Sequence, residues 1–218
     1  MADGREVREL KLLYRVSGIL DQHPQVAQVI QPVLEALAEH MGLLHGTVTL
    51  LNRQTGDISI DLAQGMSAQQ VGAGRYKLGE GVTGKVVESG EPMMIPRTSE
   101  SPVFLDRTQR GKSPDVSFLC VPVKSGSEVF GALSVDRAYD PGIDLDEDLR
   151  LLQIVASILA QAVKVRRLAE EERDRLAAEN EQLRAELRDR FQPTNIVGRS
   201  HEMQAVYDQI YTVSKSNT

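Results

Sequence analysis

The chain has 218 residues, of which 41% are hydrophobic and 26% are charged, as expected for a globular domain with additional segments. Its net charge of −6 argues against nucleic-acid binding by this piece, because a phosphate-binding surface is usually basic. No apolar run approaches the roughly 18 residues that span a membrane, and the N-terminus, MADGREVREL, carries no secretory signal. The single cysteine, Cys120, fits a reducing compartment, so we expect a cytoplasmic protein without membrane partners.

Residues 1–24 are predicted to form an N-terminal helix, because apolar residues such as Leu10 and Leu13 recur at three- and four-residue steps. The same periodicity continues to Met41 and predicts a second helix. Pro32 lies inside that pattern and leaves two alternatives: the helix kinks there, or it starts near Gln31.

Residues 46–137 have an extended pattern, and with their flanks they define a predicted core domain over 25–145. Two hairpins are expected, and a lone strand, EPMMIP, lies between them after a glycine-rich stretch and a short helix. Residues 97–115 read as a long loop, with a possible helical turn at FLDR. This order predicts an α+β fold with an antiparallel sheet flanked by helices. The expected hairpin strands are 47–51, 57–63, 116–123 and 128–136.

A long helix is predicted over 146–190, because DLDE at 144–147 resembles a capping box and no breaker follows before Pro193. Its apolar residues fall into one heptad frame, and its charges balance. A lone solvated helix is one reading; we favour a parallel two-stranded coiled coil, in which Asn180 sets the register. The predicted dimer contacts are Leu152, Val155, Leu159, Ala162, Ala169, Leu176, Asn180, Leu183 and Leu187.

The stretch GEGVTGKVV at 79–87 matches G-x-x-x-x-G-K, the core of a phosphate-binding loop. A working loop needs a buried strand before it and a Ser or Thr after the lysine to hold magnesium. Here Val86 follows Lys85, and the preceding GAGRYKL is polar and rich in glycine. We therefore expect no nucleotide hydrolysis, and no enzyme activity, from this piece.

The segment YKLGEGVTGKVVESGEPMMIP instead resembles the signature of GAF domains, at Gly79, Gly81, Gly84, Gly90 and Pro92 among others. That resemblance implies a GAF-type antiparallel sheet with a ligand-binding cup above it. The glycines allow a sharp turn, and the helix that follows would point free N–H groups at Val82 and Thr83 into the cup. For the glycines themselves, making the turn is the favoured role.

The segments HMGLLHGTVTLLNR and FLCVPVK are similar to the N-terminal domain of the nitrogen-fixation activators of the NifA, VnfA and AnfA group. The tail 191–218 resembles the beginning of the AAA+ domain of sigma-54-dependent activators. The resemblance implies a sensor that regulates an ATPase, with ATP, sigma-54 RNA polymerase and DNA as partners of the full-length protein only. A NifL-like anti-activator is a further expected partner of the sensor.

The resemblance to that family also implies a dicarboxylate effector, 2-oxoglutarate, held by arginines. Arginine suits bidentate binding of a carboxylate. The predicted ligand-binding residues are Arg75, Tyr76, Thr83, Arg97, Phe104, Arg107, Ser113 and Ser117.

Other readings of the site remain open from the sequence. Cys120 alone cannot perform the multi-thiol chemistry of GAF-type methionine sulfoxide reductases, and the histidines have no metal-ligand spacing, so no metal is expected. The alternatives are a sensor of another signal, such as nitric oxide or formate, and a purely structural dimerisation module. The histidines are His23, His40, His45 and His201.

Overall fold

The structure is a computed structural model that describes residues 3–22, 29–108, 115–190, 202–203, 205–206 and 209. The chain divides into two compact units, Met1–Arg167 and Leu168–Thr218. The first unit therefore extends beyond residue 145, where the sequence predicted the core domain to end. In the described part of the chain, no helix combines the length and apolarity that crossing a membrane requires.

The first unit is built on one six-stranded sheet in which every neighbouring pair is antiparallel, in the order β3-β2-β1-β6-β5-β4. This arrangement confirms the predicted α+β class and both predicted hairpins. The strands are β1 (His45–Leu51), β2 (Asp57–Gln64), β3 (Arg75–Lys77), β4 (Met93–Ile95), β5 (Val116–Ser125) and β6 (Glu128–Ala138).

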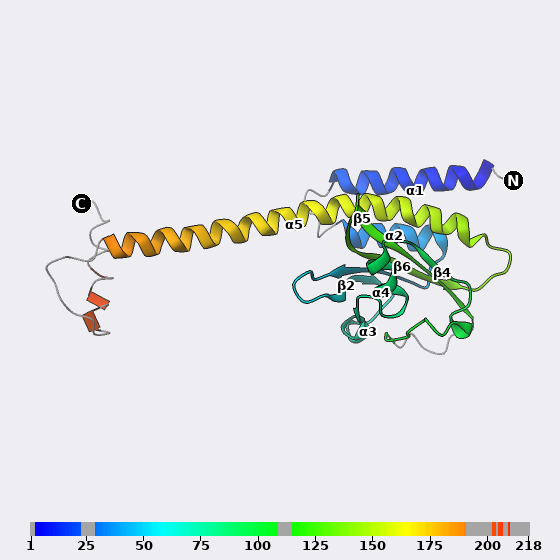
Figure 1. Cartoon of the computed structure of the whole chain (residues 1–218). Helices are drawn as coiled ribbons and strands as arrows, with labels where there is room; N and C mark the ends of the chain where they lie inside the picture. The colour runs from blue at the N-terminus through cyan, green and yellow to red at the C-terminus, as the bar shows by residue number, and fades with distance from the viewer. Residues whose placement is uncertain are drawn as a thin grey trace. The chain divides into compact units, whose positions relative to one another are not determined.

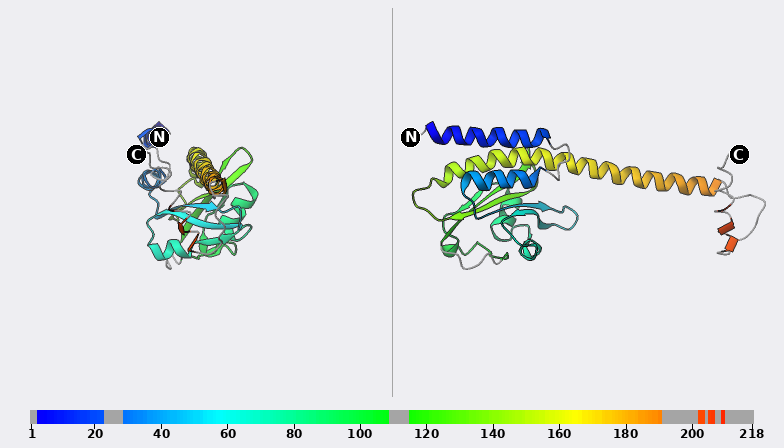
Figure 2. Two further views of the ribbon diagram at one scale, coloured as in Figure 1. Left: turned by 90° about the vertical axis from the view of Figure 1, so that its left-hand side faces the viewer. Right: turned by 180° about the vertical axis from the view of Figure 1, so that it is seen from behind.

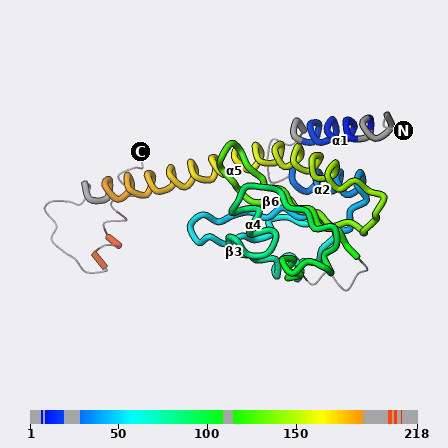
Figure 3. Tube along the Cα trace, turned by 45° about the vertical axis from the view of Figure 1, so that its right-hand side comes forward, coloured from blue at the N-terminus to red at the C-terminus, as the bar shows by residue number. Residues whose placement is uncertain are grey.

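Three helices lie on one side of the sheet: α2 (Ile30–Met41) and the first part of α5 (Leu145–Arg190) lie next to the strands, and α1 (Asp3–Gln22) packs against α2, farther from the sheet. Figures 1 and 2 show them on the same side from the front and from behind. Pro32 is the third residue of α2. Of the two alternatives, the structure therefore agrees with a helix that starts near Gln31, and not with a helix that kinks at the proline. The short helices α3 (Ala68–Ala73) and α4 (Gly81–Ser89) lie on the opposite side, as Figure 3 shows for α4.

The period of two in the strands separates two apolar cores. On β5, Leu119 and Val121 belong to the larger core, which they share with the helices α1, α2 and α5. Phe118 and Cys120 belong to the smaller core, which lies on the α4 side of the sheet. A strand that is buried on both faces explains why SFLCVPV reads as a continuous apolar run rather than an alternating one.

Helix α1 contributes the fully or nearly fully buried Leu12 and Val16 to the larger core. Leu10 and Tyr14, which carried part of the predicted periodicity, are instead exposed. The prediction of a helix is correct, but its inward face differs from the predicted one, because α1 has apolar residues on two opposite sides. Sequence periodicity cannot tell which of two such stripes meets the domain.

The start of α5 is fixed by an N-terminal cap. The Asp144 carboxylate accepts hydrogen bonds from the N–H groups of Asp146 (3.0 Å) and Glu147 (3.3 Å), which confirms the start read from DLDE. Further along, Leu152, Val155 and Leu159 are completely buried in the larger core, and Ala162 is also buried. The prediction that these four residues contact a partner chain is therefore wrong, because they pack inside their own domain.

The predicted loop 97–115 is largely irregular in its described residues, but its details differ from the prediction. A 3-10 turn, η2, occurs at Thr98–Glu100, and the expected helical turn at FLDR (104–107) is absent. Two short elements were also missed, α3 and β3. Helix α3 is nevertheless well capped, because the side chains of Ser67 and Gln70 form a reciprocal capping box.

Candidate ligand site at the sheet and the start of helix α4

The glycine-rich turn before α4 is explained by its backbone geometry. Gly79 and Gly81 have φ values of +75° and +62°, which residues with a Cβ rarely adopt. Gly84 is constrained differently, because a Cβ at this position would lie 2.2 Å from the carbonyl oxygen of Lys77. Two backbone hydrogen bonds close the turn, from Gly79 N to Gly84 O (3.0 Å) and from Gly84 N to Glu80 O (2.9 Å). The turn-making role proposed for these glycines is thus sufficient to explain them.

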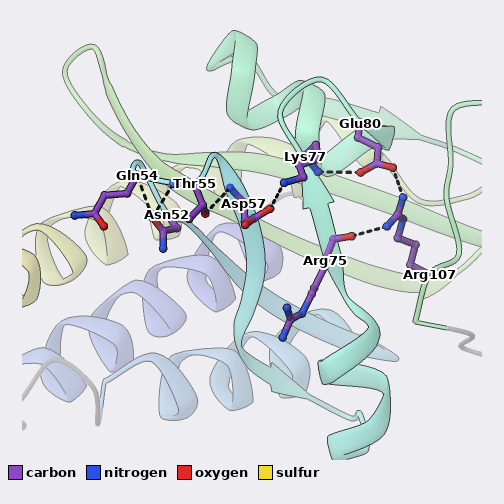
Figure 4. Close-up of polar contacts among 8 residues, drawn as sticks. All are labelled: Asn52, Gln54, Thr55, Asp57, Arg75, Lys77, Glu80 and Arg107. Atoms are coloured by element: carbon purple, nitrogen blue, oxygen red, sulfur yellow. Dashed lines mark hydrogen bonds and ion pairs between the residues drawn. The ribbon is translucent and has the colours of Figure 1, made fainter.

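Glu80 occupies the N-cap position of α4, but its side chain does not cap the helix. Its carboxylate turns outward, accepts a hydrogen bond from the backbone N–H of Lys77 (2.8 Å) and pairs with the guanidinium of Arg107 (Figure 4). The Glu80 carboxylate thus lies near the N-terminus of α4, which carries a partial positive charge, but its ion-pair partner is Arg107.

Arg107 links the loop after β4 to this turn. Besides Glu80, its guanidinium donates to the carbonyl oxygen of Arg75 (3.0 Å) and lies 5.8 Å from the ring centroid of Tyr76. Arg75 contributes only its backbone here, because its side chain points away from the cluster (Figure 4). The alternation in β3 explains this: Tyr76 faces inward, whereas Arg75 and Lys77 face solvent. The structure thus separates Arg75 from the predicted set.

Apolar side chains of the smaller core line one side of the site. Tyr76 and Phe118 are buried, and the Phe104 ring meets Phe118 edge-to-face at a centroid distance of 5.1 Å. Leu105 packs over Gly81, where a Cβ would come within 3.1 Å of its side chain. Thr83, in the first turn of α4, is also buried. The structure therefore brings Tyr76 and Phe104 together with Arg107, and it places Thr83 in the adjacent first turn of α4.

Arg97 lies in a different environment. Its guanidinium hydrogen-bonds to Glu100 (2.8 Å), lies 3.7 Å from Asp115 and stacks 4.3 Å from the centroid of the Tyr139 ring. The hydrogen bond that Arg97 donates to Glu100 is the main cause that raises the pKa of Arg97 above its ordinary value. None of these partners belongs to the Arg107 cluster, so the two predicted arginines do not form one clamp.

The two predicted serines do not join the site. Ser117 precedes Phe118 on β5 and therefore faces the helix-covered side of the sheet, with Leu119 and Val121. Its hydroxyl donates to the carbonyl oxygen of Pro96 (2.7 Å). Ser117 was predicted as a ligand contact, but strand alternation places its side chain on the face of the sheet away from the Arg107 cluster. Ser113 lies outside the described residues.

A buried polar row on the α4 face of β1 and β6 was not predicted. Three cross-strand contacts form it: His45 Nδ1 to Asp136 Oδ2 (3.2 Å), Thr47 Oγ1 to Ser134 Oγ (2.6 Å), and Thr49 Oγ1 donating to the Ala132 carbonyl (3.2 Å). Polar groups are costly to bury unless they are hydrogen-bonded, and each of the side chains in this row makes at least one such contact. In the sequence, the polar residues occupy every second position of HGTVT (45–49) and SVD (134–136). This alternation could have indicated the row, but only the pairing register of β1 with β6 places the two segments side by side.

No group of three or more His, Cys, Asp or Glu side chains within the described ranges is arranged to hold a metal ion. Cys120 is buried in the smaller core. The chemistry on offer at the site is hydrogen bonding and charge recognition: one arginine in an ion pair, a helix N-terminus, and a row of hydroxyl groups with one His–Asp pair.

An antiparallel six-stranded sheet with a glycine-shaped turn and short helix over one face, and long helices on the other side, is the architecture of a GAF domain. The family model for the GAF domain matches residues 25–163, and the chain belongs to this family. Solved structures agree on the fold: the nlh2 GAF domain of A. aeolicus has a TM-score of 0.65 at 21% identity, covering 74% of this chain and 99% of that one. A GAF domain from a phosphoenolpyruvate-protein phosphotransferase of Coxiella burnetii has a TM-score of 0.67 at 23% identity, covering 76% and 98%.

Among curated proteins, the chain is similar to nitrogen-fixation regulators, which confirms the predicted relationship. It is 38% identical to the nitrogen fixation protein VnfA of Azotobacter vinelandii over 96% of this chain, and 34% identical to AnfA of the same organism over 96%. It is 32% identical to a Nif-specific regulatory protein of Herbaspirillum seropedicae over 99%. The chain spans 41%, 40% and 41% of the length of these three relatives, respectively.

Proposed function

We propose that this chain is the sensory module of a cytoplasmic nitrogen-fixation activator and has no catalytic activity of its own. The observation that carries the proposal is the similarity to VnfA over 96% of the chain, combined with a GAF fold over residues 25–163. The module binds a small effector and passes its state through α5, as a homodimer, to the AAA+ domain whose beginning is residues 191–218. ATP, sigma-54 RNA polymerase and DNA are partners of the full-length protein.

The effector that suits the site is a dicarboxylate such as 2-oxoglutarate. One carboxylate would take the place of Glu80 opposite Arg107, close to the N–H groups that begin α4. The polar row of His45, Thr47 and Ser134 offers hydrogen bonds to the rest of the molecule. This arrangement supports Arg107, rather than Arg97 or Arg75, as the residue that recognises charge.

Isothermal titration calorimetry of the 218-residue chain with 2-oxoglutarate tests the proposal. Arg107→Ala removes a charge-assisted contact of about 1.5–3 kcal/mol and should weaken binding by about tenfold or more. Arg107→Lys keeps the charge but loses the bidentate geometry of the guanidinium, so its affinity should fall between those of the wild type and Arg107→Ala. Arg97→Ala is the matched control and should bind as the wild type does, because its ion pairs lie outside the Arg107 cluster.

Equal losses in Arg97→Ala and Arg107→Ala would contradict the assignment of the site. If the wild-type chain gives no heat with 2-oxoglutarate, a dicarboxylate sensor is excluded. The signal would then be another small molecule or a protein, such as a NifL-like anti-activator, and a pull-down with that protein would be the next measurement.

A further inference from the structure

Glu80 is a carboxylate that the fold itself holds against Arg107, the residue proposed to recognise charge. It lies between Gly79 and Gly81, both of which have positive φ values. The backbone N–H of Glu80 donates to the carbonyl oxygen of Lys77 (3.1 Å), and its carboxylate accepts from the backbone N–H of Lys77 (2.8 Å). These two hydrogen bonds fix both the backbone and the side chain of Glu80 in the turn before α4.

The direction of the Glu80 side chain is not explained by the helix that it precedes. A polar side chain at the N-cap position usually accepts hydrogen bonds from the first N–H groups of the helix, but no side-chain hydrogen bond caps α4. Glutamate is also not among the residue types that this position favours. The carboxylate instead meets the guanidinium of Arg107, as Figure 4 shows. The side chain at this position therefore serves the ion pair and not the helix.

Arg107 makes two contacts here, and one of them uses a nitrogen that an effector would need. One guanidinium nitrogen donates to the backbone carbonyl oxygen of Arg75 (3.0 Å), and the other pairs with Glu80. An arginine binds a carboxylate most strongly through two nitrogens at once. A dissolved carboxylate therefore has to compete with Glu80 for the same donor.

The exposure of the ion pair decides whether such competition is possible. The side chains of Arg107 and Glu80 are 41% and 31% exposed, so solutes can reach them. An ion pair at such a surface favours the closed form by no more than about fivefold. The pair of Arg137 and Asp148, at 14% and 7% exposure, is by contrast shielded by the protein. The Glu80–Arg107 pair is thus weak enough for an effector to displace.

We infer that Glu80 is a built-in competitor of the effector, which occupies Arg107 in the absence of effector and so sets the concentration at which the module responds. This inference rests on the proposed function, because it takes Arg107 to be the residue that recognises a carboxylate. Only molecules in which the pair is open can bind, so the apparent Kd rises by the inverse of the open fraction. A pair that is closed about five times as often as it is open raises the apparent Kd about sixfold.

Isothermal titration calorimetry with 2-oxoglutarate on the whole 218-residue chain tests this inference. Glu80→Gln keeps an oxygen for the N–H of Lys77 but has no charge to pair with Arg107, so its affinity should rise about two- to sixfold. Glu100→Gln is the matched control: it removes the same charge from a Glu–Arg pair, that of Arg97, and should bind as the wild type does. The double variant Glu80→Gln/Arg107→Ala should bind as weakly as Arg107→Ala. Thermal melting checks that each variant is folded.

The outcomes separate this inference from the proposed function. If the wild type binds 2-oxoglutarate and Glu80→Gln binds no more tightly, Glu80 only supports the turn; the inference is then overturned and the effector site stands. If Glu80→Gln and Glu100→Gln gain affinity equally, or if the gain persists in the double variant, the cause is net charge and the inference is again overturned. If no form of the chain binds 2-oxoglutarate, the proposed dicarboxylate sensor fails, and the competitor fails with it.

Discussion

Asp57 and Lys77 face each other directly across the β2–β3 pair, and their side chains form an ion pair. The hydrogen bond from Lys77, with a second from Thr55, lowers the pKa of Asp57 below its ordinary value of 3.8. The folded state therefore binds fewer protons at this group than the unfolded state does. The stability that the pair contributes is complete above pH 3.8 and is lost as the pH falls through the lower folded value.

We accordingly expect Asp57→Asn to flatten part of the acid-side fall in the thermal midpoint, between about pH 5 and about pH 3. Lys77→Ala removes the same ion pair and should flatten the dependence of the thermal midpoint on pH similarly, while the double variant should add nothing further. Scanning calorimetry across this pH range measures the thermal midpoints. A double variant whose curve is flatter than either single one would contradict the assignment to this pair.

Gly84 and Gly72 differ in the space that is available for a side chain. Both are helical glycines, but a Cβ at Gly84 would lie 2.2 Å from the Lys77 carbonyl oxygen, whereas nothing lies within 4 Å of one at Gly72. Gly84→Ala should therefore destabilise the domain by about 1–3 kcal/mol, because the turn must open. Gly72→Ala should be neutral or stabilising by about 0.5–1 kcal/mol, since alanine favours the helix. Urea unfolding compares the two, and equal midpoints would refute the steric account.

At the residue scale, the sequence predicted the site only in part. Tyr76, Phe104 and Arg107 lie beside the turn that the glycine signature forms, and Thr83 lies in the first turn of α4. Their role as ligand contacts stays a prediction. Arg97 and Ser117 do not join them, since nearness along the chain says nothing about the direction of a side chain. The polar row was missed for a related reason: it depends on the pairing register of β1 with β6.

At the scale of elements, α5 is attached to the sheet by polar contacts as well as by the core. Arg137 of β6 pairs with Asp148 of α5, and both side chains are largely buried, at 14% and 7% exposure. Arg166 pairs with Asp61 of β2 (3.2 Å), where the helix leaves the domain. These contacts hold both ends of the packed part of α5 against the strands.

Removing one partner of a buried pair leaves the other charge without compensation. Asp148→Asn should therefore cost about 3 kcal/mol or more of unfolding free energy. Glu128→Gln is the control, because Glu128 pairs with Arg53 (2.5 Å) and lies near Arg167 (3.9 Å) at a half-exposed surface. Its loss should cost less than about 1 kcal/mol. Denaturant unfolding measures both changes, and a control as costly as Asp148→Asn would argue against this difference in burial.

The elements that were predicted correctly are long or strongly patterned. The strands of both hairpins and the helices α1, α2, α4 and α5 carry enough apolar periodicity to be read directly. β3 has three residues and α3 has six, which is too short for a period to emerge. The packing partner of a long helix is harder to predict. An apolar stripe indicates that the helix is buried there, but it does not show whether the same chain or a second chain buries it.

For the whole molecule, the proposed homodimer predicts an assembly that can be separated from the folding of its domains. Leu176 and Leu183 are exposed and lie in the second unit. Replacing both with Asp should place like charges in the helix pair and shift the mass from that of two chains to about 24.1 kDa. The thermal transition of the GAF domain should persist. Multi-angle light scattering provides the mass, and an unchanged mass would show that these leucines do not hold two chains together.

The burial of Leu152 and Leu159 in the larger core limits how an effector could move α5. Sliding the helix by one residue would shift it 1.5 Å and turn it by 100°, which would withdraw both leucines from the interior and separate Asp148 from Arg137. An intact GAF domain therefore has to carry these turns of helix with it as one rigid body. In the proposed homodimer, an effector would therefore change the angle between the two α5 helices and would not slide either helix along its axis.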